Sequence, residues 1–119
     1  MKNILVVNND VDTMSLLKSY LELKSYRVEY TSSQHEALEM MKAFDPALVI
    51  VDVLQKSIIQ PLRENPATSK VPILLMSGYS LRSKDYEAGA DDVIEKPFDL
   101  AVLDNKIKKH TQGPDVSCP

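Results

Sequence analysis

The chain has 119 residues, of which 44% are hydrophobic and 26% are charged, with both signs of charge interspersed. These values are typical of one folded domain and exclude a disordered tail. The formal net charge of -3 provides no basic face, so we expect neither nucleic acid nor anionic lipid to bind this domain. The single cysteine, Cys118, cannot form an internal disulfide, which favours a reducing, cytoplasmic location.

The start of the chain, MKNILVVNND, contains a short apolar run that polar residues follow at once. It predicts neither a signal peptide nor a membrane span. Further along, apolar runs alternate with segments of helical period. The predicted strands are Asn3–Val7, Arg27–Thr31, Ala47–Asp52, Pro72–Met76 and Asp92–Glu95.

Five helices are predicted between and after these strands. They cover about Val11–Lys24, the segment from Ser33 to before Pro46, Ser57–Glu64, Ser80–Ala88 and the segment that follows Asp99. The first helix should bury an apolar stripe made of Met14, Leu17 and Leu21, widened by Leu16, Tyr20 and Leu23.

Three helix starts carry capping signals. Ser33 and Glu36 have the spacing of a capping box, and Asp99 is an expected N-cap of the last helix, with Phe98 packing on Leu103. Asp10 precedes the first helix and is expected to cap it.

Strands that alternate with helices predict a parallel sheet with helices on both faces, and ligands bind such sheets beyond the carboxyl ends of the strands. A carboxylate, a hydroxyl and an ammonium group would converge at that edge. The residues there are Asn8, Asn9 and Asp10 after the first strand, Asp52 at the third, Ser77 and Gly78 after the fourth, and Lys96 and Pro97 after the fifth.

Four segments resemble those of a known family, the receiver domains of bacterial two-component response regulators. ILVVNND resembles the first strand with its acidic cluster, DPALVIVDV the strand that ends in the phosphorylated aspartate, PILLMSG the strand that ends in the switch hydroxyl, and AGADDVIEKPFD the approach to the invariant lysine. The resemblance implies a flavodoxin-like receiver fold, with a doubly wound, five-stranded parallel sheet of order 2-1-3-4-5 flanked by five helices. The receiver domain would cover residues 1–110, and residues 111–119 would form a C-terminal tail or linker.

The resemblance also implies a function in phosphorelay signalling rather than an enzymatic one. Asp52 would accept a phosphoryl group from a histidine kinase or phosphotransferase, with Ser77 and Lys96 completing the reacting site. The signal would pass to a downstream protein or output domain, and homodimerisation is left open. A cis peptide between Lys96 and Pro97, common in the family, would aim the lysine at the site.

The acidic pair of the family is replaced here by amides. Mg²⁺ prefers oxygen ligands that include carboxylates, and Asn8 and Asn9 stand where the family has two acids. We therefore expect Mg²⁺ to bind weakly or not at all, through Asn9 and Asp52, with Asn8 and Asp10 as further candidate ligands. An ion pair between Lys96 and Asp52 could replace the bridging metal.

Two other departures concern the metal and the switch. After Asp52 the family usually has a loop with proline and glycine that positions a backbone carbonyl for the metal, whereas the segment VLQKSIIQPLREN is several residues shorter and lacks glycine. Val93 stands where the family often has an aromatic residue that swings inward when the switch hydroxyl engages the phosphate. The resemblance thus makes Ser77, at the position of the switch hydroxyl, and Val93, at the position of the aromatic residue, the candidate switch residues. An alternative function is a pseudo-receiver that binds a protein without phosphorylation.

A phosphatase or a flavin carrier on a similar sheet is disfavoured. Leu54 stands where the phosphatase would have a second acid, and the phosphate loop of a flavin carrier is absent from the sequence after the first strand. His35 and His110 have no spacing that suggests a metal site, so both are expected to face solvent.

Overall fold

Five parallel strands form one sheet in the computed structural model, which describes residues 2–8, 10–77, 89–95 and 99–111. The strands are β1 (Asn3–Val7), β2 (Arg27–Thr31), β3 (Leu48–Asp52), β4 (Ile73–Ser77) and β5 (Asp92–Glu95). They lie in the order β2-β1-β3-β4-β5, and every neighbouring pair is parallel. The predicted sheet and its order are confirmed.

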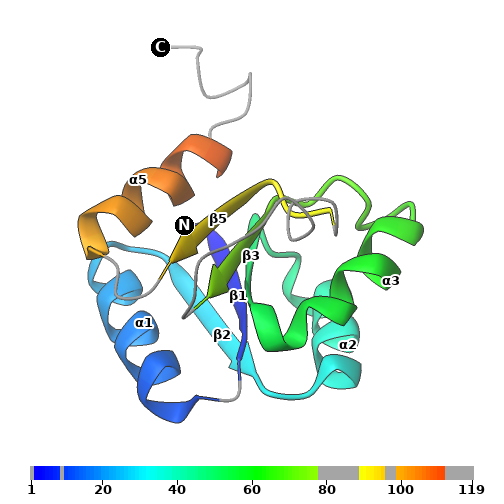
Figure 1. Ribbon diagram of the computed structural model, residues 1–119, viewed down its shortest axis with the longest axis horizontal. Coiled ribbons are helices and arrows are strands. Elements are labelled where there is room, and N and C mark those ends of the chain that lie inside the picture. The colour runs from blue at the N-terminus through cyan, green and yellow to red at the C-terminus, as the bar shows by residue number, and fades with distance from the viewer. Residues whose placement is uncertain (1, 9, 78–88, 96–98, 112–119) are drawn as a thin grey trace.

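Helices cover both faces of this sheet. They are α1 (Val11–Leu23), α2 (Gln34–Phe44), α3 (Ile59–Glu64) and α5 (Leu100–Thr111), with a 3-10 helix, η1 (Val53–Ile58), before α3. Figure 1 shows α1 and α5 on one side of the sheet and α2 and α3 on the other. The fourth predicted helix, Ser80–Ala88, lies outside the described residues. None of the described helices is long and apolar enough to cross a bilayer.

The core has two parts, one on each face, because successive strand residues point to opposite sides. Between the sheet and the α1/α5 layer, buried residues include Ile4, Val6, Leu17, Ile50, Met76, Leu103 and Ile107. Between the sheet and the α2/α3 layer, they include Leu5, Val7, Ala37, Val51, Ile59, Leu62 and Leu75. Strands β3 and β4 are buried along their whole length, as expected for the centre of a doubly covered parallel sheet.

The buried stripe of α1 is narrower than predicted. Met14, Leu17 and Leu21 are buried, as expected. Leu16 and Leu23, however, are 52% and 83% exposed. The helix contacts the sheet along one stripe, and these two leucines lie beside it.

The predicted caps are present where the structure describes them. Ser33 Oγ accepts a hydrogen bond from the Glu36 N–H at 3.2 Å, and Asp99 Oδ1 accepts one from the Ala101 N–H at 2.7 Å. The other half of the expected capping box differs, because the Ser33 N–H donates to Thr31 Oγ1 at 3.1 Å. Phe98 lies outside the described residues.

The third crossover starts earlier than predicted. Instead of a helix from Ser57, the 3-10 helix η1 begins at Val53, immediately after β3, and α3 follows it directly. Val53 and Ile58 are 4% and 1% exposed, so burial of both ends holds η1 against the sheet. A correction also applies to β4, which includes Ser77 because this residue pairs with Glu95 of β5.

Candidate functional site

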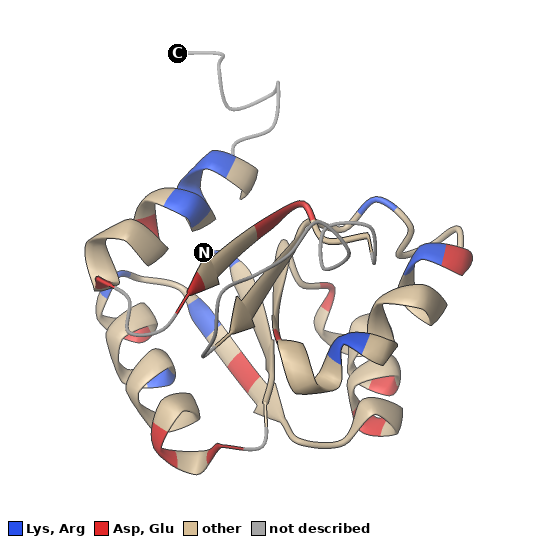
Figure 2. Cartoon of the chain, viewed as in Figure 1, with Lys and Arg blue, Asp and Glu red and all other residues tan. Residues whose placement is uncertain are grey.

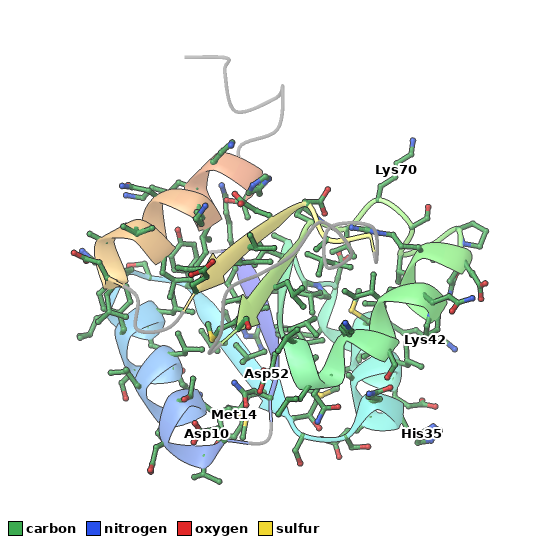
Figure 3. All side chains as sticks on the ribbon, in the orientation of Figure 1. Asp10, Met14, His35, Lys42, Asp52 and Lys70 are labelled. Carbon is green, nitrogen blue, oxygen red and sulfur yellow. The ribbon has the colours of Figure 1, made fainter. Side chains whose placement is uncertain are left out.

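Three polar residues are buried at the carboxyl ends of the adjacent strands β1, β3 and β4. Asn8 is 1% exposed, Asp52 is 7% exposed and Ser77 is fully buried. Val7 pairs with Val51, so Asn8 and Asp52 each follow a paired residue, and Asp52 pairs with Met76, the residue before Ser77. The structure therefore brings these predicted residues to one edge of the sheet, where Figure 3 shows Asp52.

The carboxylate of Asp52 is connected to the segment that follows it. Asp52 is the N-cap of η1, and its Oδ1 accepts a hydrogen bond from the Leu54 N–H at 3.4 Å. Leu54 itself is 75% exposed. A group added to the Asp52 carboxylate would therefore act directly on the start of η1.

Asn8 is a structural part of the turn between β1 and α1. Its side-chain Oδ1 accepts a hydrogen bond from the Asp10 N–H at 2.8 Å, and its backbone N–H donates to the Thr31 carbonyl at 3.0 Å. These bonds fix the Asn8 side chain at the carboxyl edge of the sheet.

Asp10 caps α1, as predicted. Its Oδ1 accepts from the N–H groups of Asp12 and Thr13, and its Oδ2 accepts from the Thr13 hydroxyl at 2.7 Å. Such bonds satisfy N–H groups that have no partner within the helix. A metal-binding role for Asp10 would compete with this cap.

Four of the predicted site residues, Asn9, Gly78, Lys96 and Pro97, lie outside the described residues. The ion pair between Lys96 and Asp52 and the cis peptide after Lys96 consequently remain predictions.

The described part of the site is poor in negative charge. Within it, no three His, Cys, Asp or Glu side chains are grouped closely enough to hold a metal ion. Asp52 contributes a buried carboxylate, whereas the amide oxygen of Asn8 carries no net charge and already accepts a hydrogen bond. Mg²⁺ prefers carboxylates, and of these two residues only Asp52 supplies one.

The second candidate switch residue, Val93, is partly buried and packs against the core on the α2/α3 side. His35 is exposed in α2, as predicted. The prediction for His110 is wrong: its side chain is only 19% exposed, and its Nε2 lies 2.9 Å from Asp92 Oδ2. The last turn of α5 packs beside the start of β5 and brings the two side chains together.

One polar cluster beside the site was not predicted. Gln34 of α2 contacts Gln55 and Ser57 of η1 through hydrogen bonds that span 21 and 23 residues of sequence. Ordinary polar residues so far apart in the chain give no pairing signal, so only the folded chain reveals this cluster.

A doubly wound parallel sheet with a buried aspartate at its carboxyl edge is the architecture of a signalling receiver. The family model described as the response regulator receiver domain matches residues 4–108. The chain belongs to this family. Receiver domains are in general signalling modules without an enzymatic activity of their own.

Curated relatives are longer than this chain. It is 32% identical to the transcriptional regulatory protein CpxR homolog of Haemophilus influenzae, over 91% of this chain and 49% of that protein. It is 33% identical to the transcriptional regulatory protein ZraR of Escherichia coli, over 98% of this chain and 29% of that protein. The chain thus spans about half or less of the length of these relatives.

Solved structures show the same fold. A putative response regulator from Chloroflexus aurantiacus matches with a TM-score of 0.88 and 28% identity, over 94% of this chain and 98% of that one. The receiver domain of a signal transduction histidine kinase from Syntrophus aciditrophicus matches with a TM-score of 0.85 and 28% identity, over 96% and 92%. The receiver domain of a sensor histidine kinase from Pseudomonas aeruginosa, which has a magnesium ion coordinated in its active site cleft, shares the fold at 19% identity, with a TM-score of 0.85 over 94% and 98%.

Proposed function

We propose that this receiver domain accepts a phosphoryl group on Asp52 from a histidine kinase or phosphotransferase, at a site with a weakened affinity for Mg²⁺. The observation that carries this proposal is the buried Asp52 carboxylate at the carboxyl edge of the sheet. Buried Asn8 follows the neighbouring strand β1, and buried Ser77 ends the neighbouring strand β4. The phosphorylated domain would then act on a downstream protein or output domain.

In the proposed reaction, an Asp52 carboxylate oxygen attacks phosphorus. A new O–P bond forms while the bond from phosphorus to the donor nitrogen breaks, and the electron pair of that bond stays with the donor. The attack brings like charges together, so catalysis is mainly positioning and charge neutralisation.

Several neighbours of Asp52 would assist this transfer. The N–H of Leu54 already donates to the carboxylate, and the buried Ser77 lies at the end of the next strand, within the edge that a phosphoryl group would occupy. The family resemblance assigns charge neutralisation to Lys96. Bound Mg²⁺, held by Asp52 and Asn9, would supply further positive charge.

A second candidate function is a pseudo-receiver that binds a partner protein without phosphorylation. It is favoured by one observation: Asn8 and Asn9 stand where the family has two acids, so two carboxylates that would hold the metal are missing. The site could then be retained for its shape rather than for chemistry.

Labelling by acetyl phosphate, with and without Mg²⁺, separates the two functions. We expect an acid-labile label on Asp52, with only a small increase in rate when Mg²⁺ is added. The matched control is Asp52→Asn, which loses the reacting carboxylate but keeps an oxygen that can cap η1. Absence of label from a folded parent protein, with and without Mg²⁺, would instead support the pseudo-receiver.

A further inference from the structure

The start of α2 and the middle of η1 are joined by a polar cluster. Gln34 Nε2 donates to Gln55 Oε1 at 3.0 Å and to Ser57 Oγ at 2.8 Å. The Ser57 hydroxyl lies 3.1 Å from Gln34 Oε1, so it can donate back to the same side chain. We call Gln34, Gln55 and Ser57 the glutamine clasp.

The clasp acts on η1, the segment whose Leu54 N–H donates to the Asp52 carboxylate. Burial of Val53 and Ile58 fixes the two ends of η1. Between these ends, Leu54 is exposed, so apolar packing holds the middle of η1 much less. Gln34 supplies a lateral attachment for that middle part.

The clasp also connects η1 to the residues that hold Asn8 in place. Gln34 directly follows Ser33, whose N–H donates to Thr31 Oγ1. The Thr31 carbonyl in turn accepts from the N–H of Asn8. A chain of hydrogen bonds and covalent bonds therefore runs from Asn8 through Thr31 to Gln34.

We propose that Gln34 is a positioning residue for the chemistry of Asp52. By holding Gln55 and Ser57, it fixes η1 and keeps the Leu54 N–H directed at the carboxylate. A donor that is itself held in place keeps the Asp52 carboxylate oriented for attack, and such positioning speeds the reaction because no reorganisation is then needed. This inference rests on the proposed acceptance of a phosphoryl group by Asp52.

The main test compares Gln34→Ala and Ser57→Ala with the parent protein in acetyl phosphate labelling. Each variant should be labelled about tenfold more slowly, because the loss of about one hydrogen bond raises the activation free energy by an amount that corresponds to this factor. The matched control is Gln60→Ala, since Gln60 is an exposed glutamine on the neighbouring α3 that bonds to Glu64. It should be labelled at the parent rate.

The double variant Gln34→Ala with Ser57→Ala tests whether the two residues act through one contact. We expect it to be labelled at the rate of Gln34→Ala, because the bonds of Ser57 within the clasp both go to Gln34 and are already lost in that variant. Losses that multiply would mean that the residues act independently, and this would overturn the clasp. Slower labelling that only follows a fall in thermal midpoint would likewise overturn a positioning role.

A second measurement does not depend on phosphorylation. Hydrogen exchange at the Leu54 amide should become about tenfold faster in Gln34→Ala, while amides in the centre of α2 keep the parent rates. An unchanged Leu54 rate would overturn the positioning role, even if Asp52 is labelled. Faster exchange at Leu54 in a protein whose parent form takes no label would support the effect on η1 and refute the proposed function of Asp52.

Discussion

At the scale of single residues, the amides after β1 set the charge of the candidate site. Asn8 Oδ1 accepts a hydrogen bond from the Asp10 N–H at 2.8 Å, and an aspartate has a carboxylate oxygen in the same place to accept it. What the amide lacks is negative charge. Replacing Asn8 and Asn9 by aspartate should therefore change the electrostatics of the site while leaving this hydrogen-bond acceptor in place.

The double variant Asn8→Asp with Asn9→Asp should bind Mg²⁺ at least about tenfold more tightly than the parent, because a strongly hydrated cation is attracted mainly by charge. Titration calorimetry measures the affinity, and acetyl phosphate labelling should become dependent on Mg²⁺. Adding Asp52→Asn to the double variant is the control and should reverse the gain. Tight binding by the parent protein would contradict this prediction.

Sequence reasoning succeeds for residues whose partners are local. The caps formed by Asp10 and Ser33 involve backbone groups two or three residues away, so residue type and position were enough to predict them. His110 was predicted wrongly because its partner, Asp92, is 18 residues away on another element. The roles of Asn9 and Lys96 still rest on the family resemblance.

At the scale of elements, β5 and α5 are joined through Asp92. Its Oδ1 lies 3.1 Å from Lys106 Nζ, and its Oδ2 lies 2.9 Å from His110 Nε2. Burial raises the pKa of Asp92, but hydrogen bonds from His110, the Val93 N–H and Lys106 outweigh burial, so the pKa lies below its ordinary value. The ionised form of Asp92 is thus favoured in the folded state.

This lowered pKa predicts a loss of stability in acid. A carboxyl group whose pKa is lower in the folded than in the unfolded state stabilises the fold above its unfolded value of about 3.9. The contribution is lost as the pH falls through the folded pKa. Urea unfolding should show that Asp92→Asn lowers the free energy of unfolding by about 1 kcal/mol at pH 7, with the difference disappearing in stronger acid. A difference that stays constant from pH 7 to pH 3 would contradict this assignment.

Arg63 of α3 binds to the chain on both sides of β4, just before β4 begins and again just before β5 begins. Its guanidinium donates to the carbonyl of Gly89 at 2.7 and 3.0 Å, to those of Ser69 and Val71, and to Asp91 Oδ2 at 2.7 Å. Gly89 has a φ of 106°, and a Cβ there would lie 3.0 Å from Ile59 Cγ2, so this position favours glycine.

Arg63→Lys should therefore be a disruptive change, although it keeps the charge. One ammonium group cannot replace a planar fork that reaches four residues, and the carbonyls left without a donor should cost about 2 to 3 kcal/mol. Urea unfolding measures the effect. Arg27→Lys is the matched control, because Arg27 is exposed and its guanidinium lies over the Phe44 ring at 5.9 Å; it should change stability by less than about 0.5 kcal/mol.

The strands were predicted well because each combines a short apolar run with polar flanks. The early start of η1 was not, because VLQKSI has neither a helix cap of its own nor helical length. Its cap is Asp52, a residue that the sequence indicated for a different role. The burial of Val53 and Ile58, which folds the segment onto the sheet, is a tertiary effect.

At the scale of the whole molecule, charges of both signs are spread over both helical layers, with basic residues gathered in the last turn of α5 (Figure 2). In receiver domains the face that includes β5 and α5 usually carries the signal, and here it contains Val93 and the segment from Leu100 to Ile107. A phosphoryl group can change the conformation of such a face only to the extent that it stabilises one of two states of the domain more than the other.

We expect this change to be small, because the proposed weak binding of Mg²⁺ and the absence of an aromatic side chain at Val93 would both reduce the difference in stabilisation between the two states. Amide NMR spectra before and after addition of beryllofluoride with Mg²⁺ measure it. Changes should stay close to Asp52 and Ser77. Large changes that extend along α5 would show a working switch and contradict this expectation.

The alternation of strands and helices was enough to predict the layered α/β architecture, since parallel strands require crossovers that cover both faces. The order of the strands came from the family resemblance, because an apolar run carries no information about its neighbour in the sheet. The clasp between α2 and η1 depends on that order and on the path of each crossover, so it could not be predicted from local patterns.

The two ends of the described chain are hydrogen-bonded to each other. Lys2 Nζ donates to the Thr111 carbonyl at 3.0 Å and to its hydroxyl at 3.1 Å. A linker of a few residues could therefore join the start of β1 to the end of α5. The chain could then be opened between Lys24 and Ser25, where both residues are exposed and Ser25 has a φ of 70°. Such a circular permutant should retain the five-stranded sheet, which would make the fold a property of its packing rather than of the order in which its segments are connected.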